Sequence, residues 1–201
     1  MTTKIPLLNR ELGVLEFNSR VLEQAENPKT PLLERLRFVC IVSSNMDEFF
    51  EIRMSGMKEQ LKSNPKSKTP DGMSITEAYD IVVEKAHALV ERKYSLLKED
   101  ILPKIAKQGV TFLTHDEWTV AQRNWAKEFF NTELVPLLTP IALDPAHPFP
   151  KVINKSLNFF VTLEGEDAFG RSAELAVVQA PRSLPRVVMM PKHLSGATQG
   201  F

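Results

Sequence analysis

The chain has 201 residues, and its 25 Lys and Arg residues balance 25 Asp and Glu residues, so the formal net charge is zero. This balance excludes a summed field that would gather nucleic acid or an anionic membrane, so any anion site must be local. With 43% hydrophobic and 25% charged residues, the composition is that of a folded globular protein, not a disordered or fibrous chain. No apolar run reaches the roughly 18 residues of a membrane-spanning helix.

The N-terminal residues and the cysteine content indicate the cellular compartment of the protein. Residues 1–13 lack the apolar core and small-residue cleavage site of a signal peptide. The lone cysteine, Cys40, excludes an internal disulfide and agrees with a reducing environment. We therefore expect a cytoplasmic protein, with peripheral membrane association left open. Cys40 falls on an apolar helical stripe and is expected to be a buried core thiol.

The first predicted helix covers residues 10–26. Asn9 is a suitable N-cap for it, and its apolar residues recur at helical spacing on one face. Thr30 followed by Pro31 provides a cap and a first-turn proline for a second helix, which is predicted to run to about Val42.

Ser43-Ser44-Asn45 interrupts this helical pattern. Asn45 can cap a third helix, because two acidic residues follow close to its positive N-terminal end. Residues 63–72 are polar and contain two prolines and a glycine, which predicts a surface loop. A capping box at Ser74 and Glu77 then opens a helix of about 26 residues that is expected to end before Pro103.

After Gly109 the pattern changes. A short apolar run precedes a capping box at Thr114, which predicts a helix from there to about Leu134. Three segments farther on are typical of strands; they are LNFFVTLEG (157–165), AELAVVQAP (173–181) and RVVMMP (186–191).

The fold class that follows is a mostly α N-terminal helical domain, residues 1–106, followed by a partial α+β domain, residues 107–201. The chain ends soon after a predicted strand, with no element to cover its edge. We therefore expect the second domain to be truncated at its C-terminal end, with exposed apolar surface around Phe159, Val161 and Val187.

The segment SSNMDEFFEIR, residues 43–53, concentrates short polar groups, two acids and an arginine at a predicted helix start. Such a turn can present an amide side chain and free backbone N–H groups to a ligand. The alternative is that Asn45 is only a helix cap and that Asp47, Glu48 and Arg53 form a solvated face. Spacing alone leaves both interpretations open.

The sequence contains no motif typical of a metal-binding, catalytic or phosphate-binding site. His87, His115, His147 and His193 lie far apart and form no metal-binding pattern, so neither a metal ligand nor a catalytic residue can be assigned. No glycine-rich phosphate loop occurs. Four lysines surround the 63–72 loop; this cluster can meet an anion or simply form a solvated surface.

Several ungapped segments resemble bacterial polyphosphate kinases. They are LNRELGVLEFNSRVLEQAENPKTPLLERLRFVCIVSSNMDEFFEIRMSGMKEQL (8–61), PLLTPIALDPAHPFPKVINKSLNFFV (136–161) and SLPRVVMMP (183–191). The resemblance implies the N-terminal helical domain and the beginning of the head domain of an enzyme that reversibly transfers the γ-phosphate of ATP to polyphosphate. It also implies that the phosphorylated histidine and the Mg²⁺ ligands belong to C-terminal domains that this chain lacks.

The resemblance transfers one nucleotide-binding residue, the asparagine of SSNMDEF, which is Asn45. An amide offers the donor and acceptor that a base edge requires. The expected partners are ATP or ADP, polyphosphate and a second copy of the chain through the head domain, with no nucleic acid. A non-catalytic helical binding or assembly module is the alternative. The chain departs from the family at Gly13-Val14, where Ser-Trp is usual, so the first helix is expected to begin later or to pack more weakly.

Overall fold

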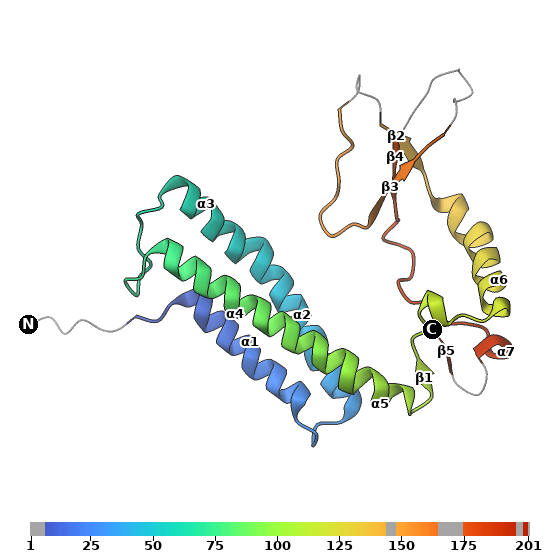
Figure 1. The fold of residues 1–201 in the computed structure, drawn as a ribbon, viewed down its shortest axis with the longest axis horizontal. Helices are drawn as coiled ribbons and strands as arrows, with labels where there is room; N and C mark the ends of the chain where they lie inside the picture. The colour runs from blue at the N-terminus through green and yellow to red at the C-terminus, as the bar shows by residue number, and fades with distance from the viewer. Residues whose placement is uncertain (1–6, 144–147, 165–174, 196–198, 201) are drawn as a thin grey trace, which may run out of the picture. The chain divides into compact units, whose positions relative to one another are not determined.

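Figure 1 shows the computed structural model, which describes residues 7–143, 148–164, 175–195 and 199–200. The chain divides into two compact units between Gly109 and Val110. The first unit is helical, and the second combines short helices with a small antiparallel sheet. This confirms the predicted fold class.

Helix α1 spans Arg10–Glu26 and begins where the sequence predicts. The Oδ1 atom of Asn9 accepts hydrogen bonds from the backbone N–H groups of Glu11 and Leu12, each 3.1 Å long. These bonds satisfy two of the amide groups that every helix start leaves free. Gly13 lies inside the helix, so of the two alternatives raised for Gly13-Val14 the later start is wrong, and weaker packing stays a prediction.

The next helix is longer than predicted. Helix α2 (Leu32–Glu48), the π-helical segment η1 (Phe49–Met54) and α3 (Ser55–Ser63) follow one another without a break. The predicted interruption at 43–45 is therefore wrong, and Asn45 caps no helix.

The start of this helix also differs from the prediction. Pro31, not Thr30, takes the N-cap position of α2, and no side-chain capping bond forms there. Pro31 contributes its carbonyl instead, which accepts a 2.9 Å bond from the backbone N–H of Arg35.

The third long helix comprises α4 (Ile75–Ser95), η2 (Leu96–Ile101) and α5 (Leu102–Ala106). Ser74 caps it as predicted, since its Oγ accepts a 3.2 Å bond from the N–H of Glu77. The helix does not end before Pro103. The π-helical η2 has already widened the helix there, and Pro103 lies in the first turn of α5, where a residue without an N–H is tolerated.

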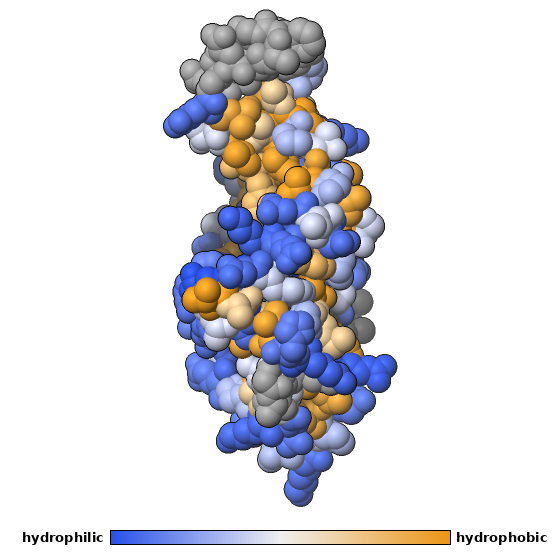
Figure 2. All heavy atoms as spheres, turned by 90° about the vertical axis from the view of Figure 1, so that its right-hand side faces the viewer, coloured by the Kyte–Doolittle hydropathy of each residue, from blue (hydrophilic) through white to orange (hydrophobic). Residues whose placement is uncertain are grey.

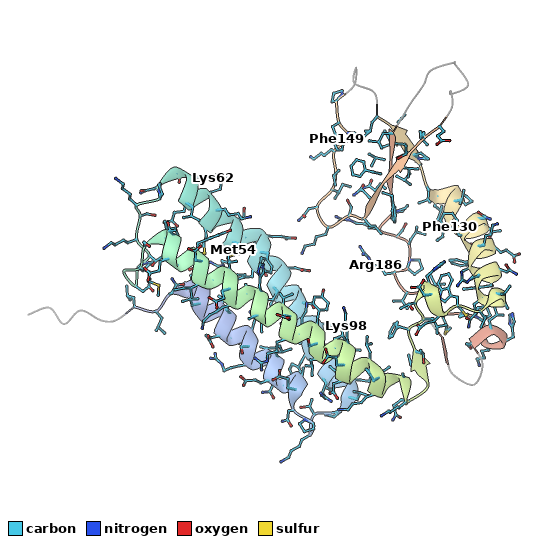
Figure 3. All side chains as sticks on the ribbon, viewed as in Figure 1. Met54, Lys62, Lys98, Phe130, Phe149 and Arg186 are labelled. Atoms are coloured by element: carbon cyan, nitrogen blue, oxygen red, sulfur yellow. The ribbon has the colours of Figure 1, made fainter. Side chains whose placement is uncertain are left out.

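Helix α1 packs against α2 and α4, and α3 packs against α4. Apolar residues from all three long helices fill the core; examples are Leu22, Val42, Phe49, Val82 and Ile101. Met54, labelled in Figure 3, is buried among them. Cys40 is exposed, so its predicted role as a core thiol is wrong: the buried stripe of α2 runs through Val39 and Val42 instead.

One buried cation joins the long helices. Arg35 is 4% exposed, and its Nε donates to the carbonyl oxygen of Ala25 at the end of α1. The guanidinium also pairs with Asp100 in η2. Because a buried guanidinium is stable only when its donors find acceptors, Arg35 fixes the ends of α1, α2 and η2 to one another.

The second unit begins with β1 (Val110–Thr111), which pairs in parallel with β5 (Gln199–Gly200). The capping box at Thr114 and Glu117 forms, but it caps a single 3₁₀ turn, His115–Glu117. Helix α6 (Val120–Phe129) begins at a second box formed by Thr119 and Gln122. Two short helical turns, η4 (Phe130–Leu134) and η5 (Val135–Leu137), continue it.

The antiparallel sheet has the strand order β2-β4-β3. Strands β3 (Asn158–Thr162) and β4 (Leu175–Gln179) lie within two of the predicted strand segments, whose residues 165 and 173–174 are outside the described part. The third strand is β2 (Pro140–Ala142), and residues 186–191 form none. Pro185 and Pro191 bound this segment, and neither has a backbone N–H to donate to a neighbouring strand. A four-residue helix, α7 (Lys192–Ser195), follows.

Several hydrophobic side chains of this unit are open to solvent, and such side chains are visible on the surface seen in Figure 2. As expected, Phe159 and Val187 are 51% and 53% exposed, and Val161 is 38% exposed. Phe149 and Phe160 stack with their ring centroids 6.3 Å apart, yet both remain more than half exposed.

Candidate functional site

Asn45 lies in the last turn of α2, directly before the π-helical η1. It is half-buried. Because the backbone is helical on both sides of it, Asn45 is not surrounded by the free N–H groups of a helix start. Its contribution to any site is therefore its side-chain amide.

A relay of two amides holds this side chain. Asn45 Nδ2 donates a 2.8 Å hydrogen bond to Asn18 Oδ1, and Asn18 Nδ2 donates a 2.9 Å bond to the carbonyl oxygen of Val14. Asn18 is 1% exposed in the middle of α1. Buried amides need such partners, because an unpaired polar group costs about 1–3 kcal/mol.

Ser43, two residues earlier, makes a matching contact on another side of α2. Lys93 of α4 is 4% exposed, and its Nζ donates a 2.8 Å bond to Ser43 Oγ. The same ammonium lies 4.0 Å from the ring centroid of Tyr94, a cation–π distance. Because an α-helix turns about 100° per residue, Ser43 and Asn45 lie about 200° apart around the axis of α2. Ser43 therefore joins α2 to α4, while Asn45 joins it to α1.

These contacts explain why no helix break forms at 43–45. Serine and asparagine disfavour a helix interior because their side chains compete for nearby backbone groups. Here Ser43 and Asn45 instead bond to Lys93 and Asn18, which belong to other helices.

A groove of about 220 Å³ opens beside the amide relay. Helix α1 contributes Val14, Phe17 and Asn18, while α2 and η1 contribute Asn45, Glu48, Phe49 and Arg53. Phe17 is 52% exposed, so it offers an aromatic face, whereas Phe49 is 2% exposed and belongs to the core. The volume is below the roughly 300–1,000 Å³ of sites that enclose a drug-sized ligand. The groove suits a single planar ring system.

The polar groups of the groove suit a base better than a metal. Asn45 Oδ1 accepts no hydrogen bond from any residue that the structure describes, and only one N–H of its amide is engaged. The amide can thus still accept and donate, as base recognition requires. Glu48 is the one lining carboxylate, and Arg53 shares the groove with it. Mg²⁺ prefers several oxygen ligands, so these residues do not fit a magnesium site.

The predicted segment 43–53 is only partly brought together. Asn45, Glu48 and Arg53 reach the groove, while Asp47 is exposed outside its lining. Sequence reasoning missed the half of the groove that comes from α1. One signal for it existed: Asn18 is a polar residue at a position where helical spacing from Leu15 and Leu22 predicts an apolar one.

The groups with shifted pKa values lie at ion pairs and caps outside the groove. Hydrogen bonds from Lys104 and then Arg35 lower the pKa of Asp100. A hydrogen bond from Lys85 lowers the pKa of Glu16 in the same way. The shifts thus mark ion pairs and a local cap, and they point to no acid–base pair in the groove.

His87, His115 and His193 belong to the described part of the chain, and His147 lies outside it. Within the described ranges, no three His, Cys, Asp or Glu residues are grouped as metal ligands.

Among the helices described, none combines the length and apolar character needed to cross a bilayer.

Comparison with known proteins places these features in a family. Residues 7–113 match the polyphosphate kinase N-terminal domain, and residues 121–201 match the polyphosphate kinase middle domain. Polyphosphate kinases of Burkholderia multivorans and Burkholderia vietnamiensis are each 61% identical to the chain over all 201 residues. The chain spans 29% of the length of these relatives.

The fold agrees with this match. The crystal structure of polyphosphate kinase from Porphyromonas gingivalis superposes with a TM-score of 0.75 at 24% identity, covering 98% of this chain and 28% of that one. Two domain models in the expected order, close sequence relatives and a shared fold agree. The chain therefore belongs to the polyphosphate kinase family.

Proposed function

We propose that this chain is the nucleotide-base-binding and subunit-contact part of a polyphosphate kinase, which reversibly transfers the γ-phosphate of ATP to polyphosphate. Asn45 is the base-binding residue. The observation that carries the proposal is the buried amide relay beside an open groove, in the SSNMDEF segment through which the chain resembles the family. An amide held in place loses little rotamer freedom when a ligand binds.

The size and the lining of the groove indicate which part of the nucleotide it binds. Its volume of about 220 Å³ fits the base, so the ribose and phosphates extend out of it. Phe17 provides an aromatic face for stacking, and Arg53 provides a cation at the groove. The phosphoryl-transfer chemistry, with its phosphohistidine and Mg²⁺, belongs to other domains of the enzyme. We propose a domain boundary at 106/107 and a cytoplasmic location.

The test of base binding uses the full-length enzyme that carries this sequence. Replacing Asn45 with Ala removes both the donor and the acceptor. We expect the KM for ATP to rise about 5- to 150-fold, the factor that 1–3 kcal/mol of binding energy produces. Asn64→Ala is the matched control, because Asn64 is an exposed asparagine of the same unit. An unchanged KM in Asn45→Ala would contradict the proposal.

Catalysis should require more than these residues. No complete set of nucleophile, base and metal ligands can be assembled from the groove. We expect the purified 201-residue chain, incubated with Mg²⁺, ATP and a polyphosphate primer, to form no ADP above background. ADP formation that follows the chain through stringent purification would contradict this expectation.

Subunit contact is proposed for the second unit, through a second copy of the chain. Exposed side chains such as Phe159, Phe160 and Val161 present apolar surface along β3. We expect concentration-dependent self-association in light scattering, weakened by Phe160→Ser. A strictly monomeric chain at high concentration would count against the contact. If association is present but Asn45→Ala leaves the KM for ATP unchanged, the assembly-module alternative is favoured.

A further inference from the structure

We infer that Asn18 is a positioning residue that sets which way the Asn45 amide faces, and so makes the groove select a base with an exocyclic amine over one with a keto group at that place. The inference rests on the proposed base-binding role of Asn45. It concerns Asn18 of α1, which is the buried member of the relay.

The relay starts from a group that cannot reverse its role. The Val14 carbonyl oxygen can only accept a hydrogen bond, and it lies 2.9 Å from the amide of Asn18. The amide end that faces Val14 must therefore be Nδ2. Since Asn18 is 1% exposed, water does not compete for this position. The rigid backbone of α1 thus fixes the orientation of the Asn18 amide.

The orientation of Asn45 follows from the next step. With Nδ2 turned to Val14, Asn18 presents Oδ1 to Asn45, and an amide oxygen can only accept. Asn45 must turn Nδ2 toward it, at 2.8 Å. Its own Oδ1 receives no hydrogen bond from the described residues and is left to accept from a ligand, beside the second N–H. One backbone carbonyl thereby decides the donor and acceptor pattern of the groove.

This pattern discriminates between purine bases. On its Watson–Crick edge, adenine presents the N6 amine next to the acceptor N1, and an asparagine amide pairs with these two atoms through its oxygen and its N–H. Guanine presents the acceptor O6 and the donor N1–H at the same places, so a fixed Asn45 meets O6 with its oxygen and N1–H with its own N–H. An amide that can flip turns Nδ2 toward O6 and Oδ1 toward N1–H, and so loses this discrimination. The selectivity between ATP and GTP therefore reports the orientation.

The test compares two substitutions at Asn18 in the full-length enzyme. Asn18→Leu has similar size and no polar atoms, so it frees the Asn45 amide. We expect a raised KM for ATP, a nearly unchanged kcat and a fall of about tenfold in the ratio of kcat/KM for ATP to that for GTP. Asn18→Asp keeps an oxygen toward Asn45, and its buried carboxyl can take up a proton to donate to Val14. It should lose thermal stability and retain the ATP-to-GTP ratio.

The outcomes separate the inference from the proposed function. If Asn45→Ala leaves the KM unchanged for both nucleotides, the base-binding role itself fails. If Asn45→Ala raises the KM for ATP but Asn18→Leu leaves the ATP-to-GTP ratio unchanged, only the positioning role is overturned. A merely structural Asn18 would weaken both nucleotides equally and leave that ratio where it was.

A second measurement uses the unsubstituted chain, so it does not depend on whether a variant folds. In the NMR spectrum of the 201-residue chain, the hydrogen-bonded proton of the Asn45 amide should exchange with water at least about tenfold more slowly than the side-chain protons of the exposed Asn64. Equal exchange rates for Asn45 and Asn64 would overturn the relay, and with it the positioning role of Asn18.

Discussion

The substitutions Asn45→Asp and Asn45→Ala distinguish a helix cap from a hydrogen bond between helices, because the two roles predict opposite orders of loss in the free energy of unfolding. An N-cap asparagine is replaced by Asp at almost no cost, while Ala costs about 1 kcal/mol. In the structure Asn45 instead donates to Asn18 Oδ1. Aspartate cannot donate, so Asn45→Asp sets a carboxylate against an oxygen whose own orientation is held by Val14.

The magnitude follows from burial. Losing the 2.8 Å hydrogen bond costs about 0.5–1.5 kcal/mol, and leaving the oxygen of a 1% exposed Asn18 unsatisfied costs about 1–3 kcal/mol. We expect Asn45→Asp to lose about 2–4 kcal/mol. Asn45→Ala should lose about 1–2 kcal/mol, because a smaller side chain lets water from the groove reach Asn18.

The assay is urea unfolding of the 201-residue chain, followed by far-UV circular dichroism, with Asn64→Asp as the control for adding a charge at an exposed site. A double-mutant cycle with Asn18→Ala should give a coupling free energy of about 0.5–3 kcal/mol. The reasoning is refuted if Asn45→Asp is as stable as the original chain while Asn45→Ala alone is destabilised, since that order is the signature of a cap.

Three further substitutions test the helical unit by unfolding. Gly13→Ala should stabilise it by up to about 1 kcal/mol, because Gly13 lies within α1 and an added Cβ meets no described atom within 4 Å; a loss of stability would contradict this. Arg35→Met should cost about 1–3 kcal/mol by breaking the buried bonds to Ala25 and Asp100; an unchanged urea midpoint would show that these bonds add nothing. The pKa of Asp100 is lowered in the folded chain, so its stabilisation is complete above the unfolded pKa of about 3.9 and is lost as the pH falls through the lower, folded value. Asp100→Asn should therefore flatten the acid limb of the stability curve, whereas the exposed Asp80→Asn should leave it unchanged; equal curves for the two variants would refute the link.

Local sequence determined the elements whose signals lie within a few residues of one another. Asn9 caps α1 and Ser74 caps α4 as predicted, because a capping side chain bonds to amides two or three residues away. The loop after α3 followed from its prolines and glycine in the same way. The resemblance also pointed to Asn45, although its role as the start of a helix was wrong.

Tertiary structure decided the features that depend on partners far along the chain. Residues 43–45 stay helical because Lys93 and Asn18 take up the side-chain bonds that would otherwise compete with the helix. The sheet includes β2 and not residues 186–191, because strand pairing joins residues far apart in the sequence, as Pro140 pairs with Val178. The α1 half of the groove arises in the same way: Asn18 lies 27 residues from Asn45, and no local pattern states which buried amide will meet which. The spacing of residues along the sequence predicts which face of one helix is buried, whereas hydrogen bonds between helices depend on how those helices pack.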